Sequence, residues 1–300
     1  MKKQWIATAI ILIGIGIIGL AFNKFALGDN TTKNIEKSWT FDANTLNNIT
    51  IIGTSNNLDV EFVQSDSDTG SIVVSGNTDK ATVDQINKAS IVNNNYELDL
   101  TTAFKLQFFS FNFEDSKIHI TVSLPKDHVL ETVYIDTNSG NLNAEHILVQ
   151  QATITTKSGN LNVAAIQAKQ AAVTTNSGNL KAEDLKAETI SLTTKSGNLN
   201  ADNITGTLQA SANSGNIKMT NASGHVTAES SSGNITISQS TVQGADVNAS
   251  SGNVTFTVAE GFSGFYELRS NSGTIKAPDS IGTSSDMIKI NTKSGNIKVK

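Results

Sequence analysis

Carboxylates are the side chains of this 300-residue chain that could supply acid, base or Ca²⁺-binding chemistry. Enzymes that cleave polysaccharides need two or three such groups close together on one face. Most aspartates here fall at different offsets from the glycines of a Ser-Gly-Asn triplet that recurs along the chain. Glu145, Glu183 and Asp202 share one offset, but Ala164 interrupts them. We expect their column to be a solvated outer face.

The other reactive side chains form no stronger pattern. The histidines lack the spacing of metal ligands, and no His and Asp recur beside the triplet serines to activate them. Cysteine is absent, which excludes disulfides, thiolate metal sites and cysteine nucleophiles. We predict that the protein is not an enzyme and has no cofactor and no metal site.

The triplet itself is the most regular feature of the chain. Glycine accepts positive φ and asparagine tolerates the left-handed region, so the triplet predicts a structural bend. If the repeated units stack in register, we also expect the triplet asparagines to form a ladder of side-chain amides along one edge of the stack. The bend glycines follow one another at steps of 18 to 22 residues: Gly140, Gly159, Gly178, Gly197, Gly215, Gly233, Gly252, Gly273 and Gly295.

Residues on both sides of each triplet alternate between apolar and polar. The second and fourth residues after every glycine are apolar, beginning with Leu142 and Ala144. Alternation with a period of two indicates half-buried strands. Units of about 19 residues are too short for a crossover helix and must stack on one another. The sequence therefore predicts an all-β fold, a single parallel β-solenoid (β-helix) that we expect to be right-handed.

Residues 1–27 contain a long apolar segment. After Lys2 and Lys3, the stretch from Trp5 to Phe22 has no charged residue. At 1.5 Å per residue it is about long enough to cross a hydrocarbon core of roughly 30 Å. We expect one N-terminal transmembrane helix as an anchor, with the repeats outside the cell membrane. Cleavage as a signal peptide after Ala26-Leu27-Gly28 is the alternative.

Three further regions follow the anchor. We predict a polar spacer at residues 28–37, irregular N-terminal β coils and a cap at 38–124, and the regular solenoid at 125–300. Residues 55–58 read Ser-Asn-Asn-Leu, a degenerate triplet that would place the first coil here. Residues 79–88 are expected to form a short helix or a loop. End coils should be atypical because they must cover strand edges.

Five phenylalanines lie within ten residues. The structural interpretation is a cap strand folded over the end of the solenoid. The alternative is an exposed patch, centred on Phe108, Phe109 and Phe111, that contacts the membrane or a partner protein. The five residues are Phe104, Phe108, Phe109, Phe111 and Phe113.

A family resemblance rests on three segments and on the recurring bends. The segments are Val122-Ser123-Leu124-Pro125, residues 130–135 (LETVYI) and Asn138-Ser139-Gly140-Asn141-Leu142. Over about residues 35–300 the chain resembles bacterial membrane-anchored proteins described as putative adhesins, with a β-strand-repeat domain of unknown function. The resemblance implies a stalk or binding surface outside the cell and, in some members, a link to the envelope-stress response. It supplies no catalytic residues.

These observations lead to one functional prediction and one alternative. We predict a non-enzymatic extracellular β-solenoid that contacts envelope polymer or a membrane protein partner. A net charge of −5 without a Lys/Arg run argues against nucleic acid. The alternative is a carbohydrate-active β-helix enzyme acting on an envelope polysaccharide, which the architecture alone motivates.

Overall fold

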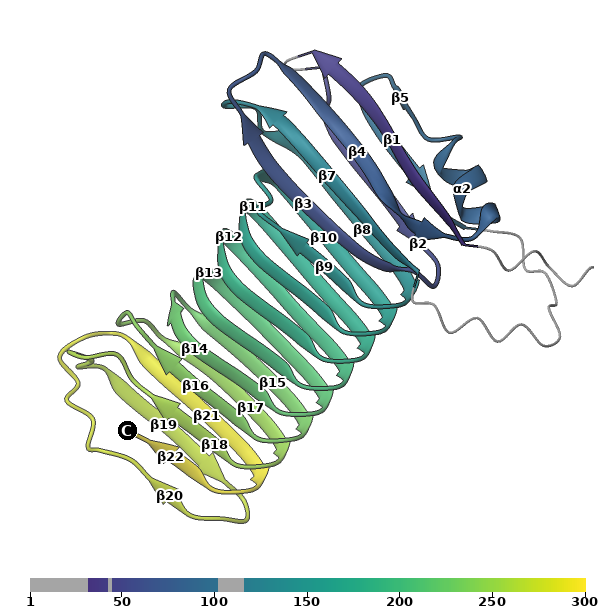
Figure 1. Cartoon of the computed structure of the whole chain (residues 1–300). Coiled ribbons are helices and arrows are strands. Elements are labelled where there is room, and N and C mark those ends of the chain that lie inside the picture. The colour runs from purple at the N-terminus through teal and green to yellow at the C-terminus, as the bar shows by residue number, and fades with distance from the viewer. Residues whose placement is uncertain (1–31, 43–44, 102–115) are drawn as a thin grey trace, which may run out of the picture.

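The computed structural model of the chain describes residues 32–42, 45–101 and 116–300. These residues form a rod of stacked coils with one short helix at the N-terminal end (Figure 1). Val173 pairs with Ile154 on one side and Leu192 on the other, so neighbouring coils are parallel and 19 residues apart. The predicted parallel β-solenoid is confirmed, while its handedness stays a prediction.

Two predicted features lie outside the described residues: the anchor at residues 1–27 and the patch of Phe108, Phe109 and Phe111. In the part of the chain that the structure describes, no helix is both long enough and apolar enough to cross a bilayer.

The middle of the rod is made of parallel strands whose triplets stack in register. Ser158, Ser177 and Ser196 are paired with one another, as are Leu161, Leu180 and Leu199. The strands are β8 (Leu130–Ser139), β9 (Leu142–Glu145), β10 (Val149–Ser158), β11 (Leu161–Ser177), β12 (Leu180–Ser196), β13 (Leu199–Ser214), β14 (Ile217–Ser223), β15 (Val226–Ser232), β16 (Ile235–Gln239), β17 (Ala245–Ser251) and β18 (Val254–Thr257).

The apolar columns predicted from the sequence fill the interior of the rod. Leu142, Leu161, Leu180 and Leu199 are fully buried and lie one above the other. The inward residues Ala210, Ala212 and Ala228 of β13 and β15 are small, whereas Met219 on β14 and Phe256 on β18 are large and fully buried. One continuous hydrophobic cluster therefore runs along the rod, and each coil buries its apolar side chains against its neighbours.

A second bend, which the sequence analysis did not predict, lies six residues after the triplet glycine in five successive coils. Its residues have φ between +53° and +61°, in the left-handed region. Asn and Asp accept this conformation readily, whereas alanine does so at a cost. The residues are His146, Ala165, Asp184, Asn203 and Asn221.

The N-terminal end contains two more coils and a cap. The coil of β2 (Asn48–Gly53) and β3 (Asn57–Ser65) stacks on β8 and β9. The coil of β6 (Asn95–Asp99) and β7 (Lys117–Pro125) stacks on its other side. Leu58 pairs with Leu142, so the degenerate triplet at residues 55–58 is the bend of a coil, as predicted.

The cap adds antiparallel strands to the parallel coils. β1 (Lys33–Asp42) pairs with β4 (Thr69–Thr78), β4 pairs with β7, and β5 (Ser90–Val92) pairs with β6. Helix α2 (Lys80–Ile86) is capped at its N-terminus by Asp79, whose carboxylate accepts hydrogen bonds from the amides of Ala81 and Thr82.

The predicted spacer at residues 28–37 requires a correction. Residues 33–37 belong to β1, where Ile35 and Trp39 pack against the core and the backbone pairs with β4. The polar composition of this stretch concealed the strand, because an edge strand with one solvated face needs few apolar residues.

The C-terminal coils do not stack in the order of the sequence. β21 (Met287–Ser294) pairs with β17 on one side and with β19 (Phe265–Ser270) on the other. Likewise, β22 (Ile297–Val299) lies between β18 and β20 (Ile275–Lys276). The coil that contains Gly273 is therefore the outermost one, and the last residues of the chain form the coil beneath it (Figure 1).

Candidate functional site

The triplet glycines are required by the stacking of the bends. The nine have φ between +100° and +154°. At Gly197, a Cβ atom would lie far inside van der Waals contact with the carbonyl oxygen of Gly178 in the adjoining coil. The same relation holds between Gly178 and Gly159. Backbone conformation and close approach thus both exclude a side chain here.

The triplet asparagines form a ladder, but with a different hydrogen bond from the one predicted. The amide N–H of Asn198 donates to Oδ1 of Asn179 at 3.0 Å, and that of Asn216 donates to Oδ1 of Asn198 at 3.0 Å. At each step the donor is the backbone N–H, because each side chain extends along the rod to the next bend. At one step the side-chain amide of Asn179 also donates to Oδ1 of Asn160, at 3.4 Å. The ladder runs from Asn57 through Asn253 and Asn296 to Thr274, which confirms the coil order at the C-terminal end.

Buried hydroxyls three residues before the glycine hold the bend from inside. Thr194 Oγ1 donates to the carbonyl of Gly178 at 3.2 Å, and Thr292 Oγ1 donates to that of Gly252 at 3.2 Å. Ser230 occupies the same position, but its buried Oγ has no hydrogen-bond partner among the described residues. The glycines, asparagines and threonines of the repeat therefore stabilise the stacked bends.

The carboxylates that share one offset are brought onto neighbouring strands. Glu183 lies beside Asp202 in register, while Ala164 separates them from Glu145. Glu61 on β3 belongs to the same row of carboxylates, because it lies directly opposite Glu145. Glu61 could not be recognised from the sequence, because the bend before β3 has no glycine.

The two central carboxylates already have partners on the protein. Glu183 forms an ion pair with Lys181 at 2.8 Å. Asp202 Oδ1 accepts hydrogen bonds from the Thr220 hydroxyl and from Asn221 Nδ2. These contacts are those of a solvated outer face, as predicted.

Three histidines lie beside single carboxylates on the surface. His119 Nδ1 is 3.2 Å from Asp59 Oδ2, which also pairs with Lys117 at 2.6 Å. His225 is 4.0 Å from Asp246, and His146 is 3.9 Å from Glu61. Within the described ranges no three His, Asp or Glu residues group as metal ligands would.

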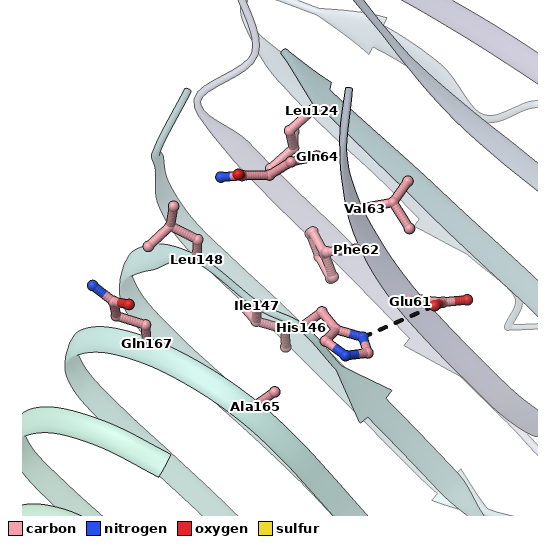
Figure 2. Close-up of a pocket in the computed structure, with 10 residues that line it drawn as sticks. All are labelled: Glu61, Phe62, Val63, Gln64, Leu124, His146, Ile147, Leu148, Ala165 and Gln167. Atoms are coloured by element: carbon pink, nitrogen blue, oxygen red, sulfur yellow. Dashed lines mark ion pairs between the residues drawn. The ribbon is translucent and has the colours of Figure 1, made fainter. Parts of the chain in front are cut away.

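A groove of about 480 Å³ opens where β3 and the coil of β9 separate (Figure 2). The chain bends away at His146, while β3 continues beside β7 to Ser65. Phe62, Leu124 and Ile147 form its apolar floor. The His146–Glu61 contact lies at the narrow end of the groove.

A second cleft, of about 400 Å³, crosses the outer face of β13, β15, β17, β21 and β19. We call it the polar cleft. Its lining is dominated by amides and hydroxyls, with Glu229, Arg269 and Lys293 as the charged side chains. The uncharged polar side chains in its outward columns are Ser211, Asn213, Ser231, Asn248, Ser250, Asn271 and Asn291.

Fold and outer surface together define a β-solenoid protein whose repeated residues maintain the coil. The chain belongs to the family described as Toastrack DUF4097, whose pattern matches residues 46–300. No curated protein matches the chain.

Several solved structures are similar to the chain. A putative adhesin from Parabacteroides distasonis is 13% identical, with a TM-score of 0.51, and the match covers 89% of this chain and 97% of that one. A putative adhesin from Bacteroides fragilis is 16% identical over 89% and 97% of the two chains, with a TM-score of 0.48. A third, named a putative lipid binding protein, also from Parabacteroides distasonis, is 15% identical over 88% and 97%, with a TM-score of 0.40.

Proposed function

We propose that the protein is a non-enzymatic binding protein of the cell envelope. It is anchored in the membrane through residues 1–27 and presents its solenoid outside the cell, where the outer faces contact envelope polymer or a membrane protein partner. A link to the envelope-stress response belongs to the same proposal and derives from the family resemblance.

The polar cleft is the observation that carries this proposal. Its hydrogen-bonding side chains recur from coil to coil at the strand spacing of about 4.8 Å. Asn248 lies beside Asn291 and Glu229, and Asn291 Nδ2 donates to Asn248 Oδ1 at 3.2 Å. A periodic row of amides and hydroxyls suits a polymer with repeated hydroxyl or acidic groups, because each unit meets the same kind of donor or acceptor.

Crosslinking of the intact protein in cells, with identification of the captured molecules, tests the proposal. Binding of isolated envelope polysaccharide to the purified protein adds a site-specific readout. Ser231→Trp fills the polar cleft and should abolish polysaccharide binding. Asn176→Trp, at the same offset in a distant coil, is the matched control and should leave binding intact. Failure to capture any envelope component, together with no polysaccharide binding, would contradict the proposal.

The carbohydrate-active enzyme is the second candidate, favoured only by the adjacency of Glu183 and Asp202. Turnover of an envelope polysaccharide that disappears in both Glu183→Gln and Asp202→Asn would support it. The contacts of Glu183 with Lys181 and of Asp202 with Thr220 and Asn221 favour the non-enzymatic function.

A further inference from the structure

The groove beside β3 contains a free strand edge. β3 pairs with β7 as far as Ser65↔Pro125 but with β9 only as far as Glu61↔Glu145. The last four residues of β3 therefore have a paired strand on one side alone. The bend at His146 causes this, because it turns the chain away from the line of β3.

The direction of the backbone groups follows from two hydrogen bonds at the start of β3. The N–H of Asn57 donates to Ser116 beside β7, whereas the N–H of Leu58 donates to Asn141 beside β9. Successive residues of a strand direct their N–H and C=O groups to opposite sides. The N–H and C=O of Gln64 consequently face the groove, beyond the end of the β3–β9 pairing.

The inward-facing side chains of β3 are buried in the core up to Phe62, and from Gln64 onward they are exposed in the groove. Leu58, Val60 and Phe62 form the inward column of β3 and are buried, but Gln64, next in that column, is exposed. Half-buried Leu148 lines the opposite wall. An added strand would thus find backbone partners on β3 and an apolar floor for alternate side chains.

The charges at the narrow end favour a basic segment. Glu61 and Glu145 face each other across β3 and β9, and both are exposed. Like charges placed opposite each other on neighbouring strands repel. Within the described chain, His146 is the basic group recorded near Glu61, at 3.9 Å. A Lys or Arg of a ligand would relieve this repulsion.

We propose that the groove binds an extended segment of a partner protein, which adds as a strand to the edge of β3 at Gln64. The segment has alternating apolar side chains and a basic residue at the end near Glu61. This is recognition by strand addition, in which main-chain hydrogen bonds provide affinity and pockets provide specificity. The inference rests on the proposed function, since it specifies how a protein partner would be held.

Two substitutions at Gln64 test the role of the backbone. Gln64→Pro removes the N–H that faces the groove, and proline is tolerated on an edge strand where that N–H is unpaired. Gln64→Ala is the matched control, because it shortens the same side chain but keeps the N–H. Thermal unfolding should show that both variants fold.

The probe is a library of random linear peptides displayed on phage, selected against the full chain in detergent. Selected peptides should be extended, alternating and basic at one end, and should bind the unchanged protein and Gln64→Ala equally. Binding to Gln64→Pro should be weaker by about tenfold or more. If Gln64→Pro does not fold, hydrogen exchange decides: bound peptide should slow exchange of the Gln64 amide in the unchanged protein.

Several results would overturn the inference. The selection could yield no peptides, or the selected peptides could bind Gln64→Pro as tightly as Gln64→Ala. The hydrogen-exchange rate of the Gln64 amide could also be the same with and without bound peptide. Self-association that Gln64→Pro abolishes would assign the groove to a second copy. If the Gln64 amide exchanges slowly without peptide, and exchanges faster once residues 104–113 are deleted, the groove binds that segment of the same chain. Capture of a protein partner that Gln64→Pro leaves unchanged would refute the groove assignment while the proposed function stands.

Discussion

At the scale of single residues, the glycine and the asparagine of the triplet have separate structural roles. Glycine leaves room for the carbonyl of the adjoining bend, and asparagine accepts the backbone N–H of the next bend. Thr274 replaces asparagine only in the outermost coil, where no further N–H needs an acceptor. The repeat therefore encodes stacking, and binding must depend on residues outside it.

The glycine requirement predicts a large cost for a side chain. Gly197→Val should lower the free energy of unfolding by roughly 3 kcal/mol or more, because it combines an unfavourable φ with a backbone clash. Asn200→Ala, three residues away and exposed, should change it by less than about 0.5 kcal/mol. Denaturant unfolding measures both, and equal midpoints would refute the role of the bend.

The asparagine ladder predicts a smaller, specific effect. Asn216→Ala removes the acceptor for the Asn234 N–H, now bonded at 2.9 Å, and should cost about 1 kcal/mol. Asn216→Asp keeps an acceptor oxygen and should recover most of that loss. Thermal unfolding of the two variants compares them, and identical losses would mean that the Oδ1 contact does not stabilise the coil.

At the scale of elements, the two ends of the rod share one arrangement. At each end, the coil nearest the chain terminus lies inside the stack. At the N-terminal end, the coil of β2 and β3 lies between the coil of β8 and β9 and the coil of β6 and β7. At the C-terminal end, the coil of β21 and β22 lies between the coil of β17 and β18 and the coil of β19 and β20. The outermost coil is formed by a segment further from the terminus. A terminal coil that is paired on both sides resists fraying, which is where solenoids are weakest.

Hydrogen exchange tests this order of coils. The amides of β21 should exchange more slowly than that of Leu268 on β19, although β21 is nearer the C-terminus. Phe265 N–H bonds to Asp286 on the β21 side, so by alternation the Leu268 N–H faces the open end. Faster exchange across β21 than at Leu268 would favour stacking in the order of the sequence.

At the scale of the whole molecule, the rod is a one-dimensional stack in which each coil contacts its neighbours. Stability in such a protein is approximately the sum of coil and interface contributions. The N-terminal end is covered by α2, β1 and β5, with Ile86 and Leu46 fully buried. At the C-terminal end, β20 leaves Ile275 exposed at 43%.

The stack predicts that one whole coil can be removed. Deleting residues 179–197 joins Gly178 to Asn198 and restores a complete triplet, so the shortened rod should fold and unfold cooperatively. Its length by small-angle scattering should fall by about 5 Å. Deleting residues 179–188 removes half a coil, breaks the register and should prevent folding. A long deletion no better tolerated than the short one would contradict the modular stack.

The repeated part of the fold and the surface character of its carboxylates could be predicted from the sequence. Leu142 and its equivalents recur at fixed offsets, and alternation around them identifies strands without any long-range information. The groove could not be predicted, because it arises where β3 and the bend at His146 diverge. β3 follows a degenerate triplet, and the bend at His146 contains no glycine. The exposed Gln64 at the end of a buried column becomes visible only with the strands in place.

The sequence by itself determined the coil, since glycine, asparagine and the apolar columns act between neighbouring bends. Glycine and the apolar columns recur in every copy, and asparagine in every copy but that of Thr274. Only the tertiary structure decided which coil lies at each end. β19 and β21 have similar local patterns, so either could stack on β17, and the choice depends on pairing between distant segments. Thr274 favours the observed order, because a coil without the Asn acceptor is satisfied only at the end of the ladder.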